Sequence, residues 1–188
     1  EGGLEADGTF AVVAAGSLDA ADAGTDKEFG LIILGDAQSE GTPDKVDFAV
    51  VHGSTDAPAV DVVLDNDTEN RFLENVPFKA FTGEEGITSY TSVDPDGFTF
   101  GVYPNGEDNG YVEGFQAKFD DLTGAALIVV ATGDVAEGTF GLTAFPAAEG
   151  DAAGRSAGVD LPKSARAQVI HNSADPAAAS VDIYVADV

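Results

Sequence analysis

Short segments of the chain alternate apolar residues with polar or small ones, which is the pattern of a β-strand with one buried face. Val46, Phe48 and Val50, for example, are separated by Asp47 and Ala49. The same period of two recurs in three further segments, at residues 60–65, 98–103 and 111–119. No stretch of a dozen residues carries the stripe of an amphipathic helix. The pattern therefore predicts an all-β fold, with short strands at the spacing of a β-sandwich.

Turn-forming residues separate these segments. Asp-Pro-Asp-Gly at 94–97 precedes one strand, and a loop rich in Asn and Gly at 104–110 separates two others. Asn-Gly and Asp-Gly supply the positive backbone angles that tight hairpins require. We therefore expect the strands on either side of residues 104–110 to form a hairpin.

Two parts of the sequence recur later in the chain. Val-Val-Ala-Ala-Gly at 12–16 reappears as Val-Val-Ala-Thr-Gly at 129–133, and Phe-Gly-Leu at 29–31 reappears at 140–142. In both places the glycine-ended segment precedes the Phe-Gly-Leu segment. Because the two segments follow each other in the same order in both places, the chain contains this structural unit twice.

The segment that contains His52 recurs as well. Val-Val-His-Gly-Ser at 50–54 reappears as Val-Ile-His-Asn-Ser at 169–173. In each case an Asp, a Pro and a Val-Asp strand follow, the strands being at 60–62 and 181–183. The chain accordingly divides into four parts: the C-terminal part of a first repeat (1–38), a complete β-sandwich repeat (44–148), a linker (149–163) and the N-terminal part of a further repeat (164–188).

The two partial repeats do not add up to a complete one, because the counterparts of about residues 70–117 are missing from their sum. Apolar positions such as Val12, Ile32, Ile170 and Ile183 are therefore left without a partner. Either the chain is part of a longer tandem array, or another chain completes the partial sandwiches by adding strands to open sheet edges.

Residues 50–62 (Val-Val-His-Gly-Ser-Thr-Asp-Ala-Pro-Ala-Val-Asp-Val) resemble the opening signature of the domain of unknown function 4397 family. Residues 78–90, 96–100 and 125–133 are similar to its later segments. The third repeat departs from the signature, because Pro176 directly follows Asp175 and an Ala-rich insertion precedes Val181. The resemblance implies immunoglobulin-like β-sandwich repeats on secreted or surface-anchored microbial proteins, with a suspected role in adhesion and no residue-level activity.

Charge narrows the classes of partner. The chain has 34 acidic and 8 basic residues, a formal net charge of -26, and yet 44% hydrophobic residues. Such a chain would be repelled by nucleic acids and anionic lipids, and no apolar run approaches the roughly 20 residues that span a bilayer. Because molar salt screens like charges, we expect a halophilic protein whose stability rises with NaCl. The start at Glu1 is expected to be a processed or excised end.

Few residues are candidates for chemistry. With no cysteine, thiolate and disulfide chemistry are absent. His52, Ser54 and Asp56 are the residue types of a hydrolytic triad, but residues two apart on a strand are too distant for a direct relay. Since the same types recur in the third repeat, we interpret the set as a structural corner: His52, Ser54, Asp56 and Pro58, with His171, Ser173 and Asp175 as the repeat.

A calcium site is a second candidate. Asp65, Asp67 and Glu69 place oxygen ligands at alternate positions, as Ca²⁺ prefers, although the segment lacks the Gly and Glu of an EF-hand loop. A solvated hairpin end is the competing interpretation. Tyr103 and Tyr111, on either side of a hairpin loop, are the best candidates for contact with a glycan or peptide.

These observations predict a non-enzymatic, extracellular structural module that associates with neighbouring repeats or identical chains by strand addition. The alternative hypothesis is an adhesion or ligand-binding module for a glycan or protein, with Ca²⁺ as a candidate cofactor. An accessory domain of a hydrolase is the third.

Overall fold

The computed structural model describes residues 9–164 except 20, 23, 66, 70, 82–89, 111 and 148–157. Its elements are β1 (Phe10–Ala15), β2 (Gly30–Gly35), β3 (Val46–His52), β4 (Val60–Leu64), β5 (Arg71–Val76), β6 (Thr91–Val93), β7 (Phe98–Pro104), β8 (Glu113–Ala117), the 3-10 turn η1 (Asp120–Leu122), β9 (Ala126–Thr132), β10 (Gly141–Pro146) and β11 (Val159–Asp160). The described residues contain no α-helix.

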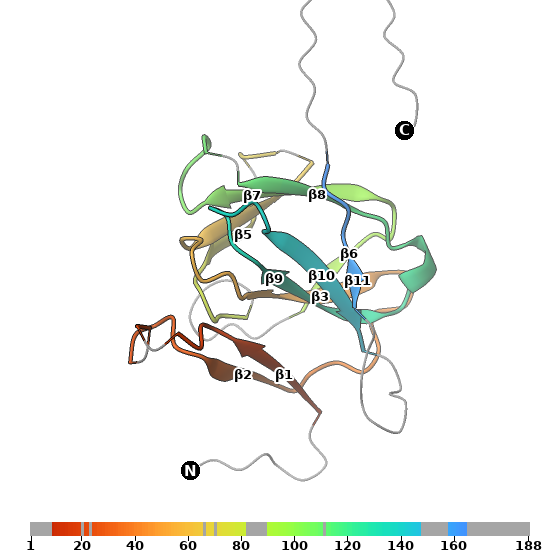
Figure 1. Ribbon diagram of the computed structural model, residues 1–188. Coiled ribbons are helices and arrows are strands. Elements are labelled where there is room, and N and C mark those ends of the chain that lie inside the picture. Colours follow the sequence, from red (N-terminus) through yellow and green to blue (C-terminus); the bar gives the residue numbers. More distant parts are fainter. Residues whose placement is uncertain are drawn as a thin grey trace, which may run out of the picture.

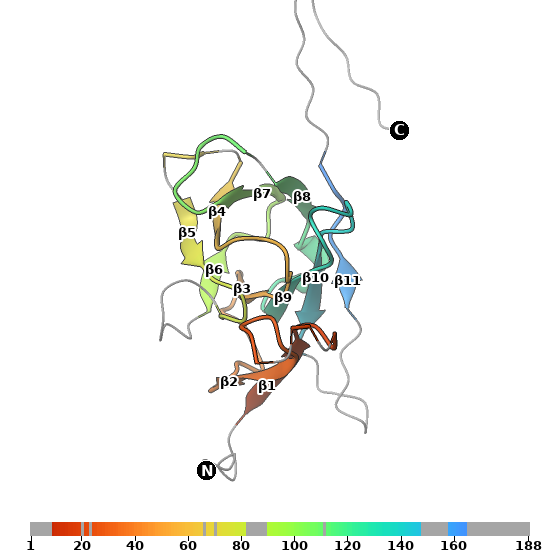
Figure 2. The same ribbon diagram turned by 60° about the vertical axis from the view of Figure 1, so that its left-hand side comes forward.

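The strands form two sheets and a separate hairpin (Figure 1). One sheet has the order β11-β10-β9-β3-β6, and the other has the order β5-β4-β7-β8. Neighbouring strands are antiparallel except β3 and β9, which run parallel. The third unit is the two-stranded hairpin β1–β2, which lies on the opposite side of the five-stranded sheet from the four-stranded one (Figures 1 and 2).

The main hydrophobic core lies between the five-stranded and four-stranded sheets. Phe48 of β3, Phe100 of β7 and Phe115 of β8 are all buried there. The rings of Phe48 and Phe100 pack edge to face, with centroids 5.4 Å apart. The molecule is therefore a β-sandwich, as the alternating pattern predicted.

A second, smaller core lies between the five-stranded sheet and the β1–β2 hairpin. Val51 and Val130 on the outer face of the sheet contact Leu34 of the hairpin, with Val13 and Ile32 packed around them. β3 is consequently buried along its whole length, whereas a strand with one wet face would alternate. The third layer of strands accounts for this departure from period two.

Two predicted boundaries differ from the structure. The predicted strand 111–119 corresponds to β8, which ends at Ala117. The predicted linker 149–163 includes β11, which pairs with β10, and Leu161, which is buried in the main core. Residues 158–164 therefore pack as part of the sandwich, because the apolar side chain of Leu161 is removed from water in the main core.

Candidate functional site

The β1–β2 hairpin has the same internal geometry as the β9–β10 hairpin of the complete sandwich. In β1–β2, Ala14 pairs with Leu31 and Val13 with Ile32. In β9–β10, Ala131 pairs with Leu142 and Val130 with Thr143. Residues that correspond in the sequence repeat therefore occupy corresponding positions in the two hairpins, and the strands pair in the same register.

The turns that follow the two first strands also correspond. Gly16 and Gly133 both have a positive φ, 110° and 76°. A Cβ on Gly16 would lie 2.5 Å from the Glu28 carbonyl oxygen, and one on Gly133 would lie 2.3 Å from that of Thr139. Only glycine fits both positions, because the returning strand passes directly against the backbone.

The two hairpins differ in what covers them. Val129, Leu142 and Ala144 point into the main core and are at most 6% exposed. Their counterparts on the outer face of β1–β2 are Val12, Leu31 and Ile33, which are 50%, 64% and 50% exposed. Phe29, the counterpart of the buried Phe140, is exposed as well. The outer face of β1–β2 is thus a core-type apolar face without a cover among the described residues.

A groove follows the edge of β1 that does not pair with β2. It has a volume of about 600 Å³ and lies between residues 9–14 and the outer surface of β9 and β10. Ile128, Val130 and Phe145 form its apolar floor, and Tyr90 lies at its side. Because β1 pairs only with β2 among the described strands, its other row of backbone N–H and C=O groups faces this groove.

The hairpin is held on the sandwich by more than its apolar inner face. The ammonium group of Lys79, in the segment after β5, donates to the carbonyl oxygens of Asp26 and Glu28. The same ammonium lies 5.2 Å from the centroid of the Phe78 ring. The turn between β1 and β2 is therefore tied to the sandwich at a second point.

The residues of the predicted corner are brought together, though not as a catalytic relay. His52 is buried, and its Nε2 lies 2.9 Å from the carbonyl oxygen of Pro58. Nε2 therefore carries the hydrogen of the neutral ring, and Nδ1 is buried without a partner among the described residues. Burial lowers the pKa of His52, and the bond to Pro58 offsets this only in part.

Asp56 has a different partner from the one that a triad needs. It accepts hydrogen bonds from the backbone N–H groups of Val135 and Ala136, both at 2.8 Å, and from Ser54 Oγ at 3.2 Å. Desolvation opposes its ionisation, but these bonds outweigh that effect and lower the pKa of Asp56. The corner thus ties the β3–β4 loop to the β9–β10 turn. His171, Ser173 and Asp175 lie outside the described residues.

The calcium candidates lie at the end of β4. An oxygen of Asp65 accepts from the N–H of Thr99 at 2.9 Å, and one of Asp67 accepts from the N–H of Glu69 at 3.2 Å. Within the described part of the chain, no three His, Cys, Asp or Glu side chains are grouped as a metal site would require. Calcium binding stays a prediction of the sequence.

The tyrosine pair does not form the expected platform. Tyr103 is buried in β7, since it is only 3% exposed, and Tyr111 lies outside the described residues. The ring of Tyr103 therefore offers no surface for a sugar to stack on.

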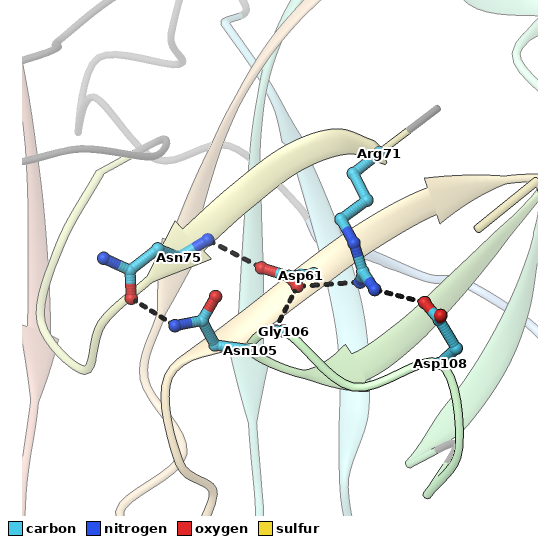
Figure 3. Close-up of polar contacts among 6 residues, drawn as sticks. All are labelled: Asp61, Arg71, Asn75, Asn105, Gly106 and Asp108. Atoms are coloured by element: carbon cyan, nitrogen blue, oxygen red, sulfur yellow. Dashed lines mark hydrogen bonds and ion pairs between the residues drawn. The ribbon is translucent and has the colours of Figure 1, made fainter. Parts of the chain in front are cut away.

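A buried ionic network on the four-stranded sheet was not predicted from the sequence, because the period of two in residues 60–65 would place Asp61 on the wetter face of its strand. Asp61 is 1% exposed and accepts three bonds of 2.7 Å, from Arg71 and from the N–H groups of Asn75 and Gly106 (Figure 3). Arg71 also pairs with the exposed Asp108. The network joins β4, β5 and the loop after β7. One signal was available: Asp61 interrupts an otherwise apolar strand, and Arg71 is a rare basic residue close to it in sequence.

Comparisons of the chain with family models, with curated proteins and with solved structures found no match. Among the described residues, no helix has the length and apolar character needed to cross a membrane.

Proposed function

We propose that this chain is a non-enzymatic structural module of an extracellular or surface assembly, built from immunoglobulin-like β-sandwich repeats, that self-associates by adding β-strands. One observation carries the proposal: the outer face of β1–β2 exposes residues whose counterparts form the main core of the complete sandwich. Soluble proteins seldom leave such a contiguous apolar face uncovered unless it binds something.

The open edge of β1 supports the same proposal. An unpaired strand edge is a template for another strand, and here it borders a groove with an apolar floor. Strand addition would satisfy backbone groups and bury apolar side chains in one step. The groove and the exposed face therefore favour the same kind of partner.

The polar sites favour a structural role over catalysis. His52 and Asp56 both use their side chains to join loops of the sandwich, and Asp61 does the same on the other sheet. The net charge of -26 makes association dependent on salt, because identical chains repel each other unless their charges are screened.

Sedimentation velocity of the full chain tests the proposal. We expect association that grows with protein concentration in about 2 M NaCl and weakens in about 0.1 M NaCl, where screening is poorer. A chain that sediments as a monomer at every concentration in both salts would overturn the proposal.

A further inference from the structure

The complete repeat indicates which strand β1 lacks. In that repeat β9 has two neighbours, β10 on one side and the parallel strand β3 on the other. In the hairpin, β2 takes the place of β10, and no described strand takes the place of β3. The missing neighbour is therefore a strand of the β3 type that runs parallel to β1.

The sequence that forms β3 recurs later in the chain. Val-Ile-His-Asn-Ser at 169–173 repeats Val-Val-His-Gly-Ser of β3 and the loop after it. We infer that residues 165–183 of a second copy of this chain pair with β1 and cover the exposed face of the hairpin. The inference rests on the self-association proposed above and assigns its partner segment.

The register follows from that of β3 and β9. Val50 pairs with Val129, and replacing each by its repeat counterpart places Val169 beside Val12. One position later, Ile170 is placed beside Val13 in the same way. Since Val50 faces the main core and Val13 faces the second core, Val169 would extend the exposed apolar face, and Ile170 would face the groove floor.

The next segment fits the same site. In the complete repeat, Val60 and Val62 of β4 belong to the core that buries the inner face of β9–β10. The Val-Asp-Ile segment at 181–183 is their repeat counterpart. It would place two apolar side chains over Val12 and Leu31, which supplies part of the cover that the hairpin lacks.

The chain path favours a second copy over the same copy. Ser164 donates its N–H to the carbonyl oxygen of Gly114 in β8, so the last described residue lies beside the four-stranded sheet. The hairpin lies on the far side of the five-stranded sheet (Figures 1 and 2). Two sheet spacings are about 20 Å, whereas the five residues from Ser164 to Val169 reach at most about 18 Å, and they would also have to pass round a sheet edge.

A disulfide between introduced cysteines tests the register, because the natural chain has no cysteine to interfere. The test variant carries Val12→Cys with Val169→Cys, and the matched control carries Val12→Cys with Ile170→Cys. A shift of one residue turns the second thiol to the other face of the strand, so oxidation should give covalent multimers about tenfold more efficiently in the test variant than in the control.

The possible outcomes separate the two proposals. Equal cross-linking in both variants, a disulfide within single chains, or no disulfide while the chain still associates would overturn this inference and leave self-association standing. A chain that does not associate at all would overturn both.

A second pair of variants tests the face without new cysteines. Leu31→Asp places a charge on the exposed apolar face, and Leu18→Asp places the same charge on an exposed leucine in the turn. We expect Leu31→Asp to sediment as a folded monomer and Leu18→Asp to associate like the unchanged chain. A peptide of residues 165–188 should also dissociate the unchanged chain. Association of Leu31→Asp at the unchanged level would contradict the assigned surface.

Discussion

The hairpins β1–β2 and β9–β10 have the same register and the same glycine turn, but they differ in their neighbours. β9–β10 has a sheet partner in β3, its inner face is buried under the four-stranded sheet, and its outer face is partly covered by the β1–β2 hairpin. β1–β2 has a covered inner face only. A hairpin with apolar side chains on both faces is expected to pack between two layers. For β1–β2, only one of these layers lies in the described part of the chain.

The largest test of this comparison places the same charge at matching positions of the two hairpins. Leu142→Asp would bury a carboxylate in the main core, and we expect a loss of more than about 4 kcal/mol, enough to unfold the domain. Leu31→Asp should change the free energy of unfolding of the monomer by less than about 1 kcal/mol, because this side chain is exposed. Urea denaturation at low protein concentration measures both. Similar losses would mean that the hairpin face is already buried.

The second test removes Asp61, the buried carboxylate that joins strands and a loop of the four-stranded sheet. Asp61→Ala removes the main partner of Arg71, whose side chain is 13% exposed, and leaves the N–H groups of Asn75 and Gly106 without their acceptor. We expect a loss of about 3–5 kcal/mol in the free energy of unfolding. The weakened cover should make the β9–β10 face resemble that of β1–β2 and increase the binding of an apolar dye. The matched control is Asp108→Ala, since Asp108 is exposed and its pair with Arg71 should contribute no more than about 1 kcal/mol. Equal effects of the two changes would contradict the role of the network.

The third test addresses the paired glycines. Gly133→Ala and Gly16→Ala each place a methyl group against a backbone carbonyl at a positive φ, which should cost about 1–3 kcal/mol. We expect Gly133→Ala to lower the stability of the whole sandwich, and Gly16→Ala to increase amide hydrogen exchange in β1 and β2 alone. Protection lost throughout the molecule in Gly16→Ala would show that the hairpin and the sandwich unfold as one unit.

The smallest effect concerns pH. Because burial lowers the pKa of His52, the unfolded chain binds a proton below about pH 6.5 that the folded chain does not. The contribution of neutral His52 to stability is therefore complete above about pH 6.5 and is lost as the pH falls, by at most about 1.4 kcal/mol per pH unit. His52→Gln should remove this slope between about pH 7 and about pH 5.5, which urea denaturation at a series of pH values measures. An unchanged slope would assign the effect to other groups.

Much of this fold could be predicted from the sequence because its strands alternate and its turns carry glycine, as at Gly97 and Gly106. The third layer of strands could not be predicted. The alternation in β3 does not by itself show that the β1–β2 hairpin covers the outer face of this strand. The burial of Asp61 was not predicted either, since one of its donors, the N–H group of Gly106, lies in a loop far from it in sequence. The matching register of the two hairpins, by contrast, follows the repeat that the sequence displays.

The β1–β2 hairpin and residues 162–164 lie on opposite sides of the molecule, and this placement affects how long an assembly of copies can grow. Each copy would carry one accepting site, the β1–β2 hairpin, and one donated segment, residues 165–183. A row of copies would therefore have two unlike ends, and nothing in the arrangement would limit its length. A copy with Leu31→Asp retains its donor segment but accepts no neighbour, and it would cap one end of a row. Small amounts of such a copy would therefore shorten assemblies without changing how each copy folds.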